Sequence, residues 1–250
     1  MKLKMKNSGV WKNCIGAISN LVEEIDFEFT EEGVEMRAMD PSHVALSEFK
    51  LSSNAFEEYE LEGPQKLGVD LGEMDRFLSR AKKNDEFTLS FDESEGRLKL
   101  KFRGESTRRF SLPLLEVEEE DLPEPDLDFT AFAKISAGAI SEGLKDAALV
   151  GDNVRFELLE DKFLMGIESD TGSVEMELSE EDGGLKELDV DEPSRSMYNI
   201  GYLDDMFKAA SSSDLVEIHH GTDLPILMIF NIADGNGKLK FLLAPRIETE

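Results

Sequence analysis

Residues 116–128 read Glu-Val-Glu-Glu-Glu-Asp-Leu-Pro-Glu-Pro-Asp-Leu-Asp, and this stretch divides the chain into two halves of similar design. More than half of it is acidic and it contains two prolines, which favours an extended connector because like charges repel and proline fixes φ. Such a connector spans at most about 43 Å, at roughly 3.3 Å per residue. Val117, Leu122 and Leu127 are apolar residues that a pure spacer does not need.

Each half shows the same order of elements: strand, helix, several strands, helix and several strands. Alternating apolar residues predict the strands, for example at Phe87/Leu89/Phe91 in the first half. Four short segments have the i, i+3, i+4, i+7 spacing of a helix that lies on a sheet, at about 8–22, 72–83, 137–149 and 202–212.

The two halves match at an offset of roughly 130 residues. This offset places Met36 opposite about Met165 and Phe110 opposite about Phe241. The sequence therefore predicts an α+β fold made of two tandem copies of one unit. The expected boundaries are an N-terminal domain at 1–115, the connector at 116–128 and a C-terminal domain at 129–250.

Composition limits the location and the class of the protein. The 250 residues are 40% hydrophobic, enough to bury a core, and 55 acidic residues face 27 basic ones for a net charge of −28. No apolar run approaches the roughly 18 residues of a membrane span, and no secretory apolar stretch follows the basic start. Cys14 is the single cysteine, and its helical pattern predicts a buried thiol. We expect a cytoplasmic protein that does not bind membranes.

Catalytic signatures are scarce. His219 and His220 are adjacent in a strand pattern and should point to opposite faces, and His43 has no metal-binding companion. Carboxylates are so abundant that chance pairs carry no weight, and no Walker loop, GxSxG elbow or GxGxxG after a strand occurs. We therefore expect no enzymatic activity, no cofactor and no metal. An acidic hydrolase that uses a carboxylate pair stays open as an alternative.

The cations are placed less randomly than the acids. Arg76, Arg80 and Lys83 fall at i, i+4 and i+7 of the second helix, opposite Phe77 and Leu78. The other three helices also carry a cation off the apolar face, at Lys12, Lys145 and Lys208. A net charge of −28 argues against nucleic-acid binding by the protein as a whole, but it leaves open a local basic strip on the helices.

Four stretches, in order along the chain, carry a resemblance to the PCNA sliding-clamp family over the whole length. Gly33–Val44 (GVEMRAMDPSHV) resembles the family's early strand and following loop, and the acidic connector resembles its interdomain connecting loop. Gly201–Met206 (GYLDDM) resembles its fourth helix, and Leu242–Glu248 (LLAPRIE) is similar to its closing motif. The Met-Asp-Pro-Ser form and the lack of a long tail are more like archaeal than eukaryotic members.

The resemblance implies a closed homotrimeric ring, with antiparallel sheets outside and four short helices of each subunit inside, around duplex DNA. It implies a processivity factor that encloses DNA without sequence preference and tethers DNA polymerase, clamp loader, flap endonuclease and ligase through short motifs with a Gln and an aromatic anchor. The DNA-facing residues would be Lys12, Arg76, Arg80, Lys83, Lys145 and Lys208. A subunit of a specialised heteromeric, checkpoint-type clamp stays open as a second alternative.

Two further surfaces follow from the resemblance. The groove for partner motifs would comprise Met39, His43, Val44, Leu122, Leu127, Pro225, Leu242, Ala244 and Pro245, with Leu242 where family members often have an aromatic residue. Subunits would join through edge strands near 107–114 and 172–179, with an interface of Arg108, Arg109, Phe110, Leu112, Glu142, Asp146, Val174, Met176 and Leu178. The two arginines are expected to pair with Glu142 or Asp146 across the seam, at about 0–1 kcal/mol for an exposed ion pair.

Overall fold

The structure, a computed structural model, describes residues 1–82, 84–117, 122, 125–170, 172–211 and 214–246. The chain forms two compact units. Unit 1 comprises Met1–Pro41, Ser47–Leu122 and Asn231–Leu239, and unit 2 comprises Ser42–Leu46, Pro123–Phe230 and Lys240–Glu250. Each unit therefore takes residues from both halves of the sequence, and the domain boundaries expected at 115 and 129 stay a prediction.

The first half of the sequence supplies the helices and most of the strands of unit 1. Its strands run in the orders β5-β1-β7-β8-β9 and β4-β3-β2-β6, and the register of each described pair is antiparallel. The elements are α1 (Gly9–Ile18), α2 (Leu71–Leu78), the 3₁₀ turn η1 (Ser53–Ala55), β1 (Lys2–Met5), β2 (Glu24–Phe29), β3 (Gly33–Met39), β4 (Ala45–Ser52), β5 (Glu58–Glu60), β6 (Gln65–Asp70), β7 (Glu86–Asp92), β8 (Arg97–Arg103) and β9 (Thr107–Pro113).

The second half repeats this plan for unit 2. Its strands run in the orders β14-β10-β16-β17-β18 and β13-β12-β11-β15. The elements are α3 (Ala137–Ala147), α4 (Ile200–Phe207), the 3₁₀ turn η2 (Ala233–Gly235), β10 (Ala131–Ser136), β11 (Asn153–Leu158), β12 (Phe163–Ser169), β13 (Gly172–Leu178), β14 (Leu185–Val190), β15 (Ser194–Asn199), β16 (Leu215–His220), β17 (Ile226–Ile232) and β18 (Gly237–Leu243).

The tandem repeat is visible in the positions of equivalent elements. β3 begins at Gly33 and its counterpart β12 at Phe163, while α2 begins at Leu71 and its counterpart α4 at Ile200, so the offset is almost the same for both pairs. The prediction of an α+β fold with two copies of one unit is confirmed. The four predicted α-helices also form, although α2 ends at Leu78 and not near residue 83.

Three of the four helices begin directly after a strand, at a side chain that caps the first turn. Asp70 accepts a hydrogen bond from the Glu73 amide at 2.8 Å, and Ser136 and Asn199 accept from the amides of Ala139 and Tyr202 at 3.4 and 3.2 Å. These oxygens satisfy amide groups that a helix start leaves without an intrahelical partner. The strand–cap–helix sequence fixes where each helix leaves its sheet, and so which of its side chains face away.

Aromatic packing fills the core of each unit. In unit 1 the Trp11 ring of α1 is buried, with its centroid 5.4 Å from that of Phe27 and 5.6 Å from that of Phe49. In unit 2 the buried rings of Phe156 and Phe163 lie 5.2 Å apart, edge to face. Cys14 on α1 is buried, as predicted, and burial raises the pKa of its thiol to about 12.

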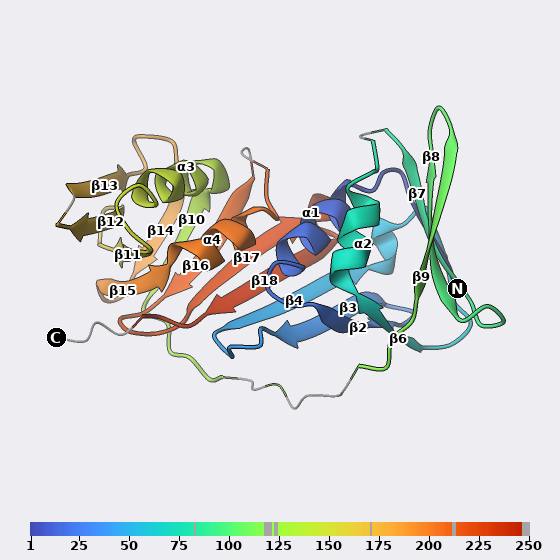
Figure 1. Ribbon diagram of the computed structural model, residues 1–250. Helices are drawn as coiled ribbons and strands as arrows, with labels where there is room; N and C mark the ends of the chain where they lie inside the picture. Colours follow the sequence, from blue (N-terminus) through green and yellow to red (C-terminus); the bar gives the residue numbers. More distant parts are fainter. Residues whose placement is uncertain (83, 118–121, 123–124, 171, 212–213, 247–250) are drawn as a thin grey trace. The chain divides into compact units, whose positions relative to one another are not determined.

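The helices lie in pairs on one side of the sheets of their units. α1 packs beside α2 in unit 1, and α3 packs beside α4 in unit 2 (Figure 1). In α2 the apolar side chains of Leu71, Met74 and Leu78 are buried while Arg76 is exposed. None of the helices within the described ranges has the length and apolar character that crossing a membrane requires.

Candidate functional site

Three helix cations are exposed, and each is ion-paired with a carboxylate three residues earlier. Arg76 Nη2 lies 2.6 Å from Glu73 Oε2, and Lys145 Nζ lies 2.6 Å from Glu142 Oε1. Lys208, directly after α4, places Nζ 2.5 Å from Asp205 Oδ1. The hydrogen bonds to these carboxylates raise the pKa of Lys145 and of Lys208. The cations thus face away from the core as expected, but none of the three is electrostatically alone.

The other predicted DNA-facing residues differ from these three. Lys12 is half-buried and donates from Nζ to the Ser79 carbonyl at 3.4 Å. Arg80 is exposed, and its guanidinium makes no hydrogen bond or ion pair with any residue that the structure describes. Lys83 lies outside the described residues.

The charges of the helix faces nearly cancel. Over 9–18, 71–80, 137–147 and 200–208, five cations stand beside six carboxylates, which are Glu73, Asp75, Glu142, Asp146, Asp204 and Asp205. Of these six acids, only Glu142 and Asp146 entered the expectations from the sequence, as partners at the subunit seam and not as neighbours of the helix cations. The signal was readable in the sequence, because an acid three residues before a cation is a neighbour on a helix.

β9 and β13 each end a sheet, as expected for the seam. β9 is the last strand of β5-β1-β7-β8-β9 and β13 the first of β13-β12-β11-β15, and both are longer than the other described strands that end a sheet. The ring of Phe110 on β9 stacks on that of Phe77 on α2 at 4.8 Å. Leu112 and Leu178 are buried within their own units, and Val174 and Met176 are half-buried.

The two seam arginines are not equivalent. Arg108 forms an ion pair with Asp85, donates to the Arg80 carbonyl, and lies 5.7 Å from the centroid of the Phe102 ring. Arg109 is exposed and forms no ion pair with a described residue. Because Arg108 is engaged inside unit 1, Arg109 is the arginine that a second subunit could meet. The expected pairing of either arginine across a seam stays a prediction.

The predicted groove residues are half-buried, apart from the exposed His43. In unit 2 the Ala244 amide donates to the Val44 carbonyl at 2.8 Å, which brings the loop after His43 next to Pro245. The backbone of His43 has a φ of 56°, in the left-handed region, and this turns the chain there. Further groove residues of unit 2 are Pro225, Leu242 and Leu127, whereas Met39 and Leu122 belong to unit 1.

The connector and the C-terminal motif are only partly described. Residues 118–121, 123 and 124 of the connector and residues 247 and 248 of the motif lie outside the described residues. Leu122 and Leu127, the two apolar residues that the sequence singled out, are both half-buried.

The adjacent histidines do point to opposite faces. His220 is buried, with Nδ1 2.7 Å from Ser194 Oγ, and burial lowers its pKa to about 4. The ring of His219 contacts Phe129 and Phe132, with centroids 5.8 and 5.1 Å away. Among the described residues, no three His, Cys, Asp or Glu side chains gather as a metal site would require.

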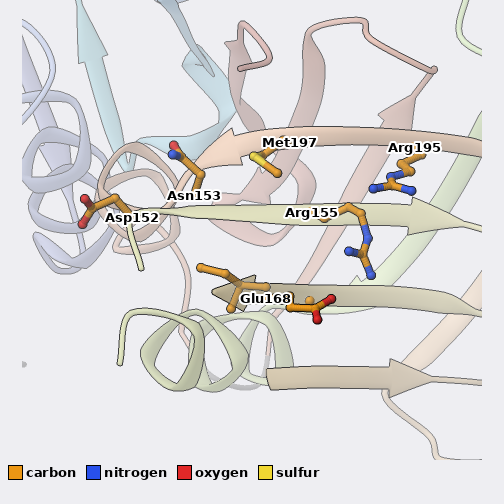
Figure 2. Close-up of a pocket in the computed structure, with 8 residues that line it drawn as sticks. Asp152, Asn153, Arg155, Glu168, Arg195 and Met197 are labelled. Atoms are coloured by element: carbon orange, nitrogen blue, oxygen red, sulfur yellow. The ribbon is translucent and has the colours of Figure 1, made fainter. Parts of the chain in front are cut away.

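One pocket of unit 2, of about 480 Å³, lies over β11, β12 and β15. Figure 2 shows Arg155 and Arg195 close together at one end and Asp152 at the other. Arg155 forms an ion pair with Glu157, and Arg195 Nε lies 4.0 Å from the same carboxylate.

The pocket does not resemble a catalytic centre. Its lining residues are Asp152, Asn153, Arg155, Gly166, Ile167, Glu168, Arg195 and Met197, a set without a nucleophilic hydroxyl, thiol or imidazole. The carboxylates of Asp152 and Glu168 point in different directions (Figure 2), so they do not form the carboxylate pair of the hydrolase alternative.

Two family models match this chain in tandem. The N-terminal domain of proliferating cell nuclear antigen (PCNA) matches residues 1–122, and the C-terminal domain matches residues 124–246. The chain belongs to the PCNA family. The resemblance based on the four sequence stretches is therefore confirmed, and the two tandem α+β copies along the sequence are PCNA domains.

Relatives and solved structures agree with this assignment. The chain is 43% identical over 234 residues to a DNA polymerase sliding clamp of Thermococcus gammatolerans, covering 94% of this chain and 93% of the relative. It is similar to the structure of the Sulfolobus tokodaii PCNA2–PCNA3 complex, with a TM-score of 0.91, 30% identity and coverage of 99% and 100%. It is also similar to A. fulgidus PCNA bound to the C-terminal region of FEN-1, with a TM-score of 0.89, 29% identity and coverage of 100% and 99%.

Proposed function

We propose that this chain is a DNA sliding clamp, a polymerase processivity factor that encloses duplex DNA and tethers replication and repair enzymes to it. The observation that carries the proposal is the tandem PCNA match over residues 1–122 and 124–246, on a fold with a free edge strand in each unit. The family's members from Thermococcus are named DNA polymerase sliding clamps at about this chain's own length.

Ring assembly follows from the two edge strands. An edge strand exposes unpaired amide and carbonyl groups, which invite pairing with another chain. β9 and β13 lie in different units, so pairing β9 of one copy with β13 of the next is a head-to-tail contact, and such contacts generate closed rings when the rotation closes. We place Arg109, Phe110, Val174 and Met176 at this seam and propose a homotrimer.

Enclosure also agrees with the charge of the protein. A chain of net charge −28 repels DNA at long range, and its helix faces carry no net positive charge to overcome this. A protein of this kind stays on DNA by topology and not by affinity. The helix cations Lys12, Arg76, Arg80, Lys145 and Lys208 then serve as scattered phosphate contacts.

Partner enzymes would dock through the groove residues. The half-buried apolar side chains of Leu127, Pro225 and Pro245 in unit 2 are suited to receive the aromatic anchor of a short motif. The complex of a related PCNA with the C-terminal region of FEN-1 supports a flap endonuclease as one partner. DNA polymerase, clamp loader and ligase are the other partners we propose, for a non-catalytic protein that acts in the cytoplasm at the nucleoid.

Retention on circular DNA tests enclosure. The protein is loaded with its clamp loader onto nicked circular duplex, freed from unbound protein by gel filtration, and the DNA is then cut once. We expect the clamp to co-elute with the circle and to be released by the cut, because a ring slides off a free end. Equal release before and after cutting would refute enclosure.

A heteromeric clamp is the second candidate, favoured by the similarity to the PCNA2–PCNA3 complex of S. tokodaii. Sedimentation of the purified chain separates the two, since a homotrimer needs one gene product only. A trimer at micromolar concentration supports the homomeric ring, whereas a monomer at every salt concentration would favour the heteromeric one.

A further inference from the structure

The ion pairs on the helix faces form a repeated pattern that clamp function by itself does not require. In each case the carboxylate stands three residues before the cation, in the pairs Glu73–Arg76, Glu142–Lys145 and Asp205–Lys208. We propose that these three paired carboxylates compete with DNA phosphate for the helix cations, and so keep the clamp's hold on DNA weak enough for sliding. The proposal rests on the DNA-clamp function put forward above.

The geometry of the pairs is that of charge-assisted hydrogen bonds. The nitrogen–oxygen distances are 2.6, 2.6 and 2.5 Å, and Lys208 has a second carboxylate, Asp204, at 3.8 Å. A phosphate oxygen that approaches Arg76, Lys145 or Lys208 must therefore displace a carboxylate oxygen already at contact distance. Each of these cations contributes less attraction than its formal charge suggests.

The pairs are exposed, so displacement is feasible. The side chains of Lys145 and Glu142 are 63% and 75% exposed, and those of Arg76 and Glu73 are 67% and 40% exposed. Ion pairs in this environment are weak because water screens them. Phosphate can thus exchange with carboxylate at each pair, and the clamp moves from one phosphate to the next without a deep minimum.

Two cations lack such a carboxylate and supply the contrast within the same molecule. Gly9 and Phe77, three residues before Lys12 and Arg80, are not acidic, and the Arg80 guanidinium has no ion pair with a described residue. Lys12 donates to a backbone carbonyl at 3.4 Å. Arg80 is therefore the cation that contacts phosphate first, because Lys12 is half-buried and is attracted by the Asp75 carboxylate. The paired cations bind phosphate only by exchange with their carboxylates.

Removing the paired carboxylates should strengthen DNA binding in a way that salt reveals. Each additional phosphate neutralised steepens the dependence of log K on log salt by about 0.9. Between about 50 and 200 mM salt this amounts to roughly a 3.5-fold larger loss of affinity per additional contact, or about 40-fold for three.

A matched pair of variants separates local release of cations from a general change of charge. The helix variant combines Glu73→Gln, Glu142→Gln and Asp205→Asn. The control variant combines Glu62→Gln, Glu93→Gln and Glu160→Gln, at exposed residues outside the helices that form no ion pair with a described residue. Both remove three carboxylates and change the charge of the chain from −28 to −25.

Affinity for a short duplex is measured by fluorescence anisotropy between about 50 and 200 mM salt. Sedimentation follows assembly of the ring. Diffusion along DNA is measured on stretched DNA. We expect the helix variant to bind several-fold more tightly than the control variant at low salt, to show the steeper salt dependence, and to diffuse more slowly. If the combined variant fails to assemble, the three single variants replace it. Each should lose about 3.5-fold more affinity than wild-type protein between about 50 and 200 mM salt.

The outcomes distinguish this inference from the function on which it rests. If the helix and control variants bind and diffuse alike while wild-type protein is retained on circular DNA, competition by the paired carboxylates is refuted and the clamp function stands. If wild-type protein is not retained on the circle, the clamp function fails and the inference fails with it.

Discussion

Reversing the charge of Arg109 should loosen the proposed ring without harming the subunit. Arg109 is exposed on β9, has no ion pair with a described residue, and would face Asp146 of the next subunit, because Glu142 is already paired with Lys145. Arg109→Glu replaces an attraction across the seam by a repulsion between acids. Its side chain is outside the core, so the fold of unit 1 should be unaffected.

The expected magnitude follows from the exposure of the pair. Within the range of about 0–1 kcal/mol for exposed ion pairs, a pair at contact distance is taken to contribute about 0.5–1 kcal/mol, so exchanging attraction for an equal repulsion costs about 1–2 kcal/mol at each seam. Three seams give about 3–6 kcal/mol per ring. Because the midpoint concentration of a monomer–trimer equilibrium varies with the square root of the dissociation constant, it should rise roughly 12- to 160-fold.

Sedimentation equilibrium at about 0.1 M and 1 M salt measures this shift, with Lys6→Glu as the matched control. Lys6 is exposed, has no described ion pair, and follows β1, which stands three strands from β9, or roughly 14 Å at about 4.8 Å per strand. That distance exceeds the Debye length of about 10 Å at 0.1 M, whereas at 1 M the length is about 3 Å. Equal shifts in the two variants, or a shift for Arg109→Glu that persists at 1 M salt, would refute a charged seam at β9.

The remaining predictions concern the groove and the core. Leu122→Ala with Leu127→Ala should weaken binding of a Gln-plus-aromatic peptide by about 30-fold, the equivalent of roughly 2 kcal/mol, and should leave the trimer intact. Calorimetry measures the peptide affinity and sedimentation the trimer. Unchanged peptide binding would show that these residues are not part of the groove. Because the pKa of His220 falls from 6.5 to about 4 in the folded state, its stabilising contribution is present above pH 6.5 and is lost as the pH falls toward 4. The advantage of wild-type protein over His220→Gln in denaturant unfolding should thus shrink by about 1.3 kcal/mol between pH 7.5 and 5.5, and a constant difference would contradict the buried neutral ring.

The helices and the tandem repeat could be predicted because their signals are local. An apolar stripe of period 3.6 needs only one buried side, and each of the four helices has one. Some strands, such as β4, lack a simple alternating pattern. In β4 the consecutive residues Ala45, Leu46 and Ser47 are all buried, which hides the period of two.

The N-terminal strand shows how charge conceals a buried face. Leu3 and Met5 of β1 are buried, but the intervening cations made the segment look like a basic terminus. Lys4 Nζ lies 3.1 Å from Glu86 Oε2 at the start of β7 and 3.5 Å from Glu57 Oε2 just before β5. Only the folded chain brings these carboxylates near Lys4.

The register of the repeat was harder to predict than its existence. β9 begins at Thr107 and its counterpart β18 at Gly237, and aligning these first residues would place Phe110 opposite Lys240. A shift by a single position moves every side chain to the other face, so the strand ends alone do not decide the match. The buried faces decide it: Phe110 and Leu112 of β9 correspond to Phe241 and Leu243 of β18.

The helix faces explain how so acidic a chain can serve as a clamp. In the proposed ring, three copies of a chain of charge −28 would carry −84, and helix faces with six described carboxylates beside five cations could not hold DNA against that field by attraction alone. The time that the clamp stays on DNA would then depend on closure of the ring. Its rate of diffusion along DNA would depend on the exchange between carboxylate and phosphate at the helix cations. The two properties are therefore separable by mutation. Arg109→Glu should shorten residence on circular DNA without changing diffusion along it, and replacing the paired carboxylates should slow diffusion without weakening the ring.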